Sequence, residues 1–248
     1  MIVKRLIGVV TVRNGWAVQS FGYRRWLPLG RPEILVANLD RWGVDEILIQ
    51  CIDRSAAGAG PDLALLERIA ATGCATPLIY AGGIRDVDDA AAVVRCAADR
   101  VAIDALLHDA PERLPALADR LGSQAVIAAF PLSTAGWRDY RSGTDGPLPA
   151  SVRNLLADGH VSEALVIDWR NEGTPGGFDT ALLDPDLPDG LRLIAFGGLT
   201  DPSVMRLALA NPRVAAIAVG NALSYREHAV QAAKEALGGA PLRAAHYA

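Results

Sequence analysis

The feature that most constrains the fold is an internal repeat. Residues 193–199 read LIAFGGL, and a near copy, LIYAGGI, occupies residues 78–84. Each is a short apolar run that ends in Gly-Gly before a helical pattern, which predicts a buried strand followed by a helix. Two more pairs match at nearly the same offset, about half of the 248 residues: Glu46 with Glu163, and residues 101–103 with 217–219. Three matches in phase predict two similar halves of strand–helix units.

Apolar runs typical of buried strands recur along the whole chain, with helical patterns such as 111–121 and 223–237 between them. The expected strands cover residues 6–12, 46–52, 78–81, 100–103, 125–130, 164–168, 192–196 and 214–219. We therefore predict an α/β fold: one (β/α)8 TIM barrel domain over 1–248, with half-barrels of about 1–121 and 122–248. A doubly wound open sheet is the alternative. Residues 16–29 and 133–147 are expected to be long loops, and the sequence does not determine their role.

Composition excludes several classes of function. The net charge is −4, and no basic cluster is larger than the pair Arg24-Arg25, so no nucleic-acid surface is expected. No apolar run reaches the roughly 18 residues that a membrane span needs. Cys51, Cys74 and Cys96 are odd in number and unclustered, which favours reduced thiols and a cytoplasmic location. The four histidines show no metal-ligand spacing, so we expect neither a metal nor a cofactor.

Glycine-rich loops follow three consecutive strands of the second half. Glycine lets backbone N–H groups approach an anion, and a helix N-terminus adds a favourable partial charge, so these loops predict a phosphate cradle. The simpler alternative is that each glycine pair only makes a tight turn. The first half keeps one such pair, but Asp104-Ala105 follows its next strand, and a carboxylate there disfavours a second phosphate. The candidate binding residues are Gly82, Gly83, Gly173, Thr174, Gly197, Gly198, Gly220 and Asn221.

With these residues in view, the chain resembles the cyclase subunit of imidazole glycerol phosphate synthase. It also resembles related subunits that supply ammonia chemistry for the amidination of cell-surface sugars. The resemblance covers most of the chain and is carried by KRLIGVVTVRNG (4–15), GVDEILI (43–49), YAGGIRD (80–86), GSQAVIA (122–128) and GTPGGFD (173–179).

The resemblance implies that ammonia enters the barrel from a glutaminase docked on its bottom face. In that family a ring of four charged side chains closes the entrance, and the matching positions here are Arg5, Glu46, Arg100 and Glu163. Each lies at the start of an expected strand, so all four belong to the bottom face. Gly8 and Ala128 are expected to leave room above them. The alternative is a ring of salt bridges that only stabilises the barrel floor.

The chain departs from the family at the two aspartates that serve as acid and base. Thr11 and Pro131 occupy those positions, so general acid–base chemistry in the family's manner lacks both groups. Asp104 and Asp168 end two strands and are the candidate replacements, expected to point across the barrel mouth. Helix capping and loop hydrogen bonding are the commoner roles of aspartate at such places.

We therefore predict an ammonia-dependent synthase or lyase-type subunit that acts with a glutaminase partner. Its substrate would be a small phosphorylated or nucleotide-linked molecule. Two alternatives stay open: a non-catalytic barrel that serves as a scaffold or regulator, and a divergent cyclase of histidine biosynthesis. The missing aspartates count against the second of these. The sequence leaves the acceptor substrate and the oligomeric state open.

Overall fold

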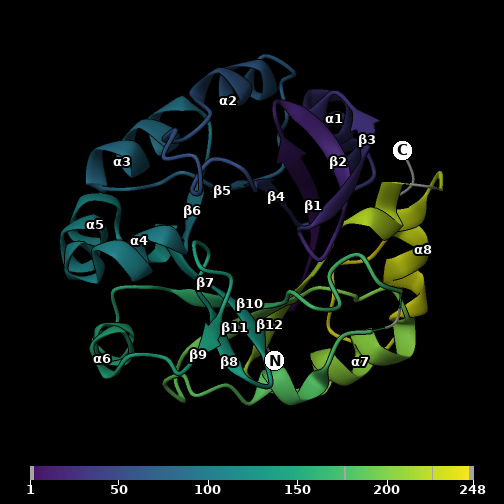
Figure 1. Ribbon diagram of the computed structural model, residues 1–248. Coiled ribbons are helices and arrows are strands. Elements are labelled where there is room, and N and C mark those ends of the chain that lie inside the picture. Colours follow the sequence, from purple (N-terminus) through teal and green to yellow (C-terminus); the bar gives the residue numbers. More distant parts are fainter. Residues whose placement is uncertain (1–2, 176, 225, 246–248) are drawn as a thin grey trace.

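The computed structural model describes residues 3–175, 177–224 and 226–245. Within them, eight parallel strands form a closed barrel, and the expected (β/α)8 TIM fold is confirmed (Figure 1). Hydrogen bonds link the strands in the order of the chain, and β12 pairs with β1 to close the ring. The barrel strands are β1 (Arg5–Arg13), β4 (Glu46–Cys51), β5 (Leu78–Ala81), β6 (Arg100–Ile103), β7 (Val126–Ser133), β10 (Glu163–Asp168), β11 (Arg192–Phe196) and β12 (Val214–Val219).

Helices surround the barrel and cover its outer face (Figure 1). Aspartate side chains cap three of them in the way the sequence favours: Asp62, Asp86 and Asp201 each accept a backbone N–H of the first turn. The helices are α1 (Pro32–Arg41), α2 (Leu63–Ala70), α3 (Val87–Cys96), α4 (Ala105–Asp109), α5 (Leu114–Leu121), α6 (Ala150–Ala157), α7 (Pro202–Ala210) and α8 (Ala229–Ala236). Short 3-10 turns lie at Pro111–Arg113, Ser123–Ala125, Thr180–Leu183 and Asn221–Ser224.

Strand alternation sorts the apolar residues into two clusters. Because successive side chains of a strand point to opposite faces, one set packs under the helices and the other fills the barrel interior. We call the second set the inner cluster: Ile7, Val9, Leu48, Ile79, Ala81, Ala102, Ile127, Ala129, Leu165, Ile167, Ile194, Phe196, Ala216 and Ala218. Side chains two residues before or after these positions therefore also face the barrel axis.

The expected loop at 16–29 is instead a β-hairpin, so that expectation was wrong. β2 (Trp16–Phe21) pairs antiparallel with the end of β1, and β3 (Arg25–Gly30) pairs with β2. The chain turns at Asn14-Gly15, both with positive φ (49° and 76°), which is the backbone that an Asn-Gly hairpin turn needs. The hairpin rises beside the barrel mouth (Figure 1).

Other boundaries also differ from those expected. The loop at 133–147 contains two short strands, β8 (Gly136–Arg138) and β9 (Asp145–Gly146). The expected helix over 111–121 is divided into a 3-10 turn and α5, and α4 precedes it. Of the described residues in the expected helix over 223–237, only α8 is α-helical. Tyr225 lies outside the described residues. Among the residues described, no helix combines the length and the apolar character needed to cross a membrane.

Candidate functional site

Four charged side chains meet at the bottom of the barrel. Arg5 Nη1 lies 3.0 Å from Glu46 Oε2, and its Nη2 contacts Glu163. Arg100 completes the ring, with Nη1 3.3 Å from Glu46 and Nη2 2.6 Å from Glu163. The two carboxylates are about one-tenth exposed and Arg5 one-quarter. We expected these four residues to meet because each lies at the start of a strand. Two cations and two anions together carry no net charge. We call it the floor ring.

Burial affects the ionisation of one carboxylate of the floor ring. It raises the pKa of Glu46, and the nearby Glu163 acts in the same direction, while Arg5 and Arg100 oppose the rise. The ring is thus a site where charge is tolerated only because it is paired.

Apolar side chains fill the barrel above the floor ring. Small residues do lie there, but they are not those that the sequence analysis named. A side chain at Gly8 would meet Leu39 of α1, and Ala128 packs in the cluster under the helices, so both face outward. The inward-facing small residues are Ala81, Ala102, Ala129, Ala216 and Ala218.

A cavity of about 400 Å³ opens at the barrel mouth, over the carboxyl ends of β4 to β7 and β10. It reaches down to Ala102 and Leu165, the inward-facing residues that directly follow Arg100 and Glu163 on their strands. A strand rises about 3.3 Å per residue, and these residues lie two positions after the ring residues. The lower end of the cavity is therefore about 7 Å above the floor ring. Side chains of the inner cluster lie between the two.

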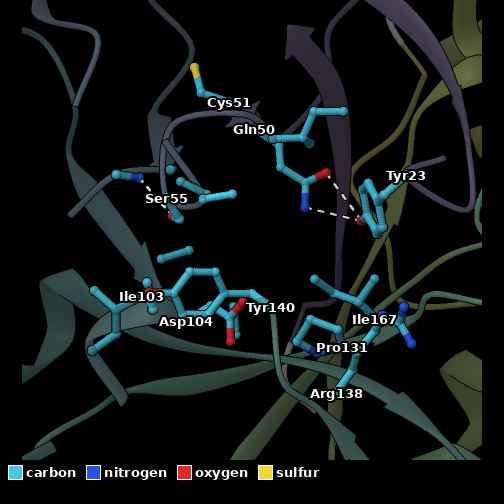
Figure 2. Close-up of a pocket in the computed structure, with 18 of the residues that line it drawn as sticks. Tyr23, Gln50, Cys51, Ser55, Ile103, Asp104, Pro131, Arg138, Tyr140 and Ile167 are labelled. Carbon is cyan, nitrogen blue, oxygen red and sulfur yellow. Dashed lines mark hydrogen bonds between the residues drawn. The ribbon is translucent and has the colours of Figure 1, made fainter. Parts of the chain in front are cut away.

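The hairpin covers one side of this cavity. Tyr23, at the hairpin tip, packs against the inner cluster, and its hydroxyl lies 3.1 Å from Gln50 Nε2, which donates to it (Figure 2). Tyr23 has a positive φ of 58°, a backbone that a non-glycine residue adopts only when its surroundings fix it. Burial raises the pKa of the Tyr23 hydroxyl well above its usual value.

The predicted phosphate cradle of the second half lies apart from the mouth cavity. Its residues, Gly173, Gly197, Gly198, Gly220 and Asn221, line a separate hollow of about 30 Å³. The hairpin reaches into this region, because the Asn221 side chain donates to the Ser20 carbonyl oxygen at 2.8 Å. The Thr174 amide donates within its own loop, to the Asn171 carbonyl oxygen.

Glu172 anchors the hairpin beside that cradle. Its carboxylate accepts from the Ser20 hydroxyl at 2.9 Å and from the Tyr23 amide at 3.3 Å, and its carbonyl oxygen accepts from the Gly22 amide at 2.9 Å. The side chain is buried, and burial raises its pKa. An anionic group of the chain itself thus stands where the sequence predicts an external anion.

The glycine pair of the first half lines the mouth cavity. A side chain at Gly82 would collide with the Cys51 carbonyl oxygen, and one at Gly83 with the Gly60 carbonyl oxygen. The Gly83 amide donates to the Ser55 hydroxyl at 3.0 Å. Close backbone packing therefore accounts for both glycines without a ligand.

The two candidate aspartates point in opposite directions. Asp104 follows Arg100 and Ala102 on the inward face of β6 and lines the mouth cavity. Asp168 has the parity of the outward face, contrary to expectation, because Leu165 and Ile167 are the inward residues of β10. Its carboxylate accepts from the Asn171 side chain and the Asp179 amide, each at 2.8 Å, and so organises the loop that follows.

The sequence matches the family described as "Histidine biosynthesis protein" over residues 5–229. The chain belongs to this family. It is a divergent, cyclase-like member. It is 31% identical over 213 residues to imidazole glycerol phosphate synthase subunit HisF of Symbiobacterium thermophilum, and the match covers 81% of this chain and 82% of the relative. It is also 28% identical to HisF of Hyphomonas neptunium, over 98% of this chain and 99% of the relative.

A further relative is described as a putative imidazole glycerol phosphate synthase subunit, hisF2, of Vibrio vulnificus. The identity is 27%, over 98% of this chain and 91% of the relative. Within the cyclase-like barrel, Pro131 lines the mouth cavity from β7, and Thr11 is buried on β1. Neither side chain ionises, so both positions are occupied by groups that cannot serve as acid or base near neutral pH.

Sequence reasoning missed several side chains of the mouth. Gln50 carries no recognisable motif, and its pairing with Tyr23 depends on where the hairpin tip falls. His108 lies beside Asp104, and the spacing of four residues at a helix start could have indicated that contact. Within the described part of the chain, no group of three or more His, Cys, Asp or Glu residues could hold a metal ion.

Proposed function

We propose that this barrel receives ammonia from a glutaminase bound to its bottom face and delivers it to a substrate in the mouth cavity. The observation that carries the proposal is the depth of the mouth cavity. Its deepest lining residues, Ala102 on β6 and Leu165 on β10, are the first inward-facing residues above the floor ring. Ammonia that passes the ring would meet only apolar side chains before it reaches the mouth, and an apolar path favours the neutral molecule over ammonium ion.

The charges around the mouth support an anionic substrate. Four guanidinium-bearing residues, Arg13, Arg24, Arg138 and Arg141, line the cavity, and arginine binds phosphate well through its planar set of donors. Arg138 and Arg141 already pair with Asp145 and Asp109, so a small phosphorylated or nucleotide-linked substrate would bind chiefly to Arg13 and Arg24. Amidination of a sugar is the finer form of this proposal, and cytoplasmic location fits the three free cysteines.

Binding of the glutaminase tests the proposal. The tagged barrel, retained on a column, should capture glutamine-hydrolysing activity from a lysate of its native cell, measured as glutamate released from glutamine. Val3 is 54% exposed and precedes Arg5 at the bottom face, so Val3→Asp should abolish the capture. Leu207 is similarly exposed (59%) on α7, and Leu207→Asp is the matched control that should leave it intact. If both variants capture the activity equally, the bottom face is not the docking site.

A scaffold or regulatory role is the second candidate, and one observation favours it. The hairpin and Glu172 reach into the second-half cradle, which would weaken the binding of an external phosphate there. We still expect sulfate to bind near Gly198 rather than near Asp104, and crystals grown in sulfate test this. Sulfate near Asp104 with none near Gly198 would reverse the assignment of the two half-sites.

A further inference from the structure

We propose that Asp104 is the proton-transfer residue of the mouth cavity and that His108 is its positioning residue. The proposal rests on the proposed ammonia chemistry, since it names the group that takes a proton from the reacting nitrogen. Proton transfer would then be carried out by a residue that follows β6, with support from α4, because the side chains of Thr11 and Pro131 cannot serve as acid or base.

Asp104 stands at the boundary between the cavity and a buried cluster of polar side chains. Its position is the residue before α4, where aspartate ordinarily caps the helix. Here it makes no side-chain cap hydrogen bond, whereas Asp62, Asp86 and Asp201 all do so at equivalent positions. The capping role therefore does not account for this carboxylate, and Figure 2 shows it beside Tyr140 in the cavity.

His108 lies directly behind Asp104. Its Nε2 is 3.4 Å from Asp104 Oδ1, and its Nδ1 is 3.7 Å from Asp139 Oδ2. The imidazole stacks on Trp137 with 3.6 Å between ring centroids and 17° between planes, so the ring is fixed in orientation. Trp137 belongs to β8, which holds it through pairing with β7.

Three polar atoms at this point are buried without a hydrogen-bond partner: Asp104 Oδ1, His108 Nε2 and Trp137 Nε1. Unpaired buried polar atoms are costly, and a cluster of them beside a cavity is typical of a functional site. The Asp104 side chain is 26% exposed although Oδ1 is fully buried, so the exposed part of the group faces the cavity. Contacts of this kind commonly shorten when substrate binds.

The proton transfers balance without a further reagent. When ammonia attacks a carbonyl carbon of the substrate, a C–N bond forms and the π electron pair of C=O moves onto oxygen. The nitrogen, now positively charged, loses one proton to the Asp104 carboxylate. Protonated Asp104 then returns that proton to the oxygen, which gives a neutral carbinolamine. His108 keeps the Asp104 side chain oriented, and it stabilises the ionised carboxylate that exists before the first transfer and again after the second.

The surrounding charges set the direction of each expected effect. Burial raises the pKa of Asp104, and Asp139 acts in the same direction, while His108 and Trp137 oppose the rise. Tyr23 and Tyr140 are further titratable groups near this carboxylate, and Arg138 and Arg141 line the same cavity. Tyr140 donates a hydrogen bond of 2.6 Å to Asp109, which also pairs with Arg141. Removing the His108 nitrogens should thus raise the titration midpoint of Asp104, and neutralising Asp139 should lower it.

Carboxyl ¹³C NMR of the full chain with labelled aspartate measures this midpoint, and Asp104→Asn assigns the resonance. His108→Phe keeps a ring to stack on Trp137, and we expect it to lower the acid dissociation constant of Asp104 about tenfold. Asp139→Asn should change it in the opposite direction and by less, because Asp139 is 37% exposed and water screens its charge. His108→Gln gives a second variant if the Phe variant does not fold.

A chemical probe tests whether the mouth reaches this carboxylate. Carbodiimide activation in ¹⁵N-ammonium chloride converts an accessible carboxyl group into a labelled amide, which peptide mass spectrometry detects. Asp104 should react in the wild-type protein. The proposal is overturned if Asp104 stays unlabelled, or if neither His108 variant raises its midpoint. Neither measurement involves the glutaminase, so a failure here is distinct from a failure of ammonia delivery.

Discussion

Replacement of Glu163 by Gln is the sharpest test of how the floor ring contributes to stability. Glu163 contacts both arginines of the ring, so Glu163→Gln leaves Arg5 and Arg100 to share the single carboxylate of Glu46. The ring then changes from neutral to a net charge of +1 at a site where the side chains are mostly buried.

Removing one partner of a buried ion pair costs about 3–5 kcal/mol, because a charge is left without compensation. Arg5 is 25% exposed and water screens part of its charge, so we expect the lower end, about 3 kcal/mol. For a chain of this length that corresponds to a fall in Tm of about 6–12 °C.

Urea unfolding followed by far-ultraviolet circular dichroism measures the change in the free energy of unfolding. Glu33→Gln is the matched control, because Glu33 pairs with Arg68 at 3.8 Å and Arg68 is 47% exposed. That loss should cost no more than about 1 kcal/mol. If Glu163→Gln unfolds within about 0.5 kcal/mol of the wild type, water reaches the ring freely and the reasoning from burial is wrong.

Three further predictions concern the mouth and the hairpin. Burial raises the pKa of Glu172 above its usual 4.5, so this group stabilises the fold at low pH, and that contribution is lost as the pH rises through the raised pKa. The stability of the wild type relative to Glu172→Gln, measured by urea midpoints, should therefore be lower at pH 8 than at pH 4.5. The new side chain of Gly173→Ala would collide with the hairpin at Ser20, so this variant should speed tryptic cleavage at Arg24-Arg25. Gly159→Ala is the control, because Gly159 has a similar positive φ but open space around it. It should cost only about 1–2 kcal/mol of strain and leave the cleavage rate unchanged. With ammonium ion supplied directly, imidazole glycerol phosphate should not form at a measurable rate, because loss of each acid–base group costs ~10²–10⁴-fold; turnover on the order of 1 per second would contradict this.

Much of the architecture follows from local patterns. The repeated apolar runs predicted the barrel, and their starting residues predicted the floor ring, because side chains at equivalent positions of parallel strands meet at one end of a barrel. The same alternation could have shown that Gly8 and Ala128 face the helices and that Asp168 faces away from the mouth. Counting by twos from Arg5 and Glu163 gives Ile7, Val9, Leu165 and Ile167 as the inward residues.

The contents of the mouth were decided by tertiary structure. Whether a glycine loop is an open cradle depends on what packs against it, and here that is Ser20, which lies more than 150 residues away in the chain. Tyr23 meets Gln50, and His108 is fixed by Trp137, only because the hairpin and β8 fold back over the barrel. The sequence by itself determined the strands and the charged floor, since alternation and strand starts are local properties. Burial and the approach of distant segments decided the rest, because these set the charge, orientation and access of each side chain.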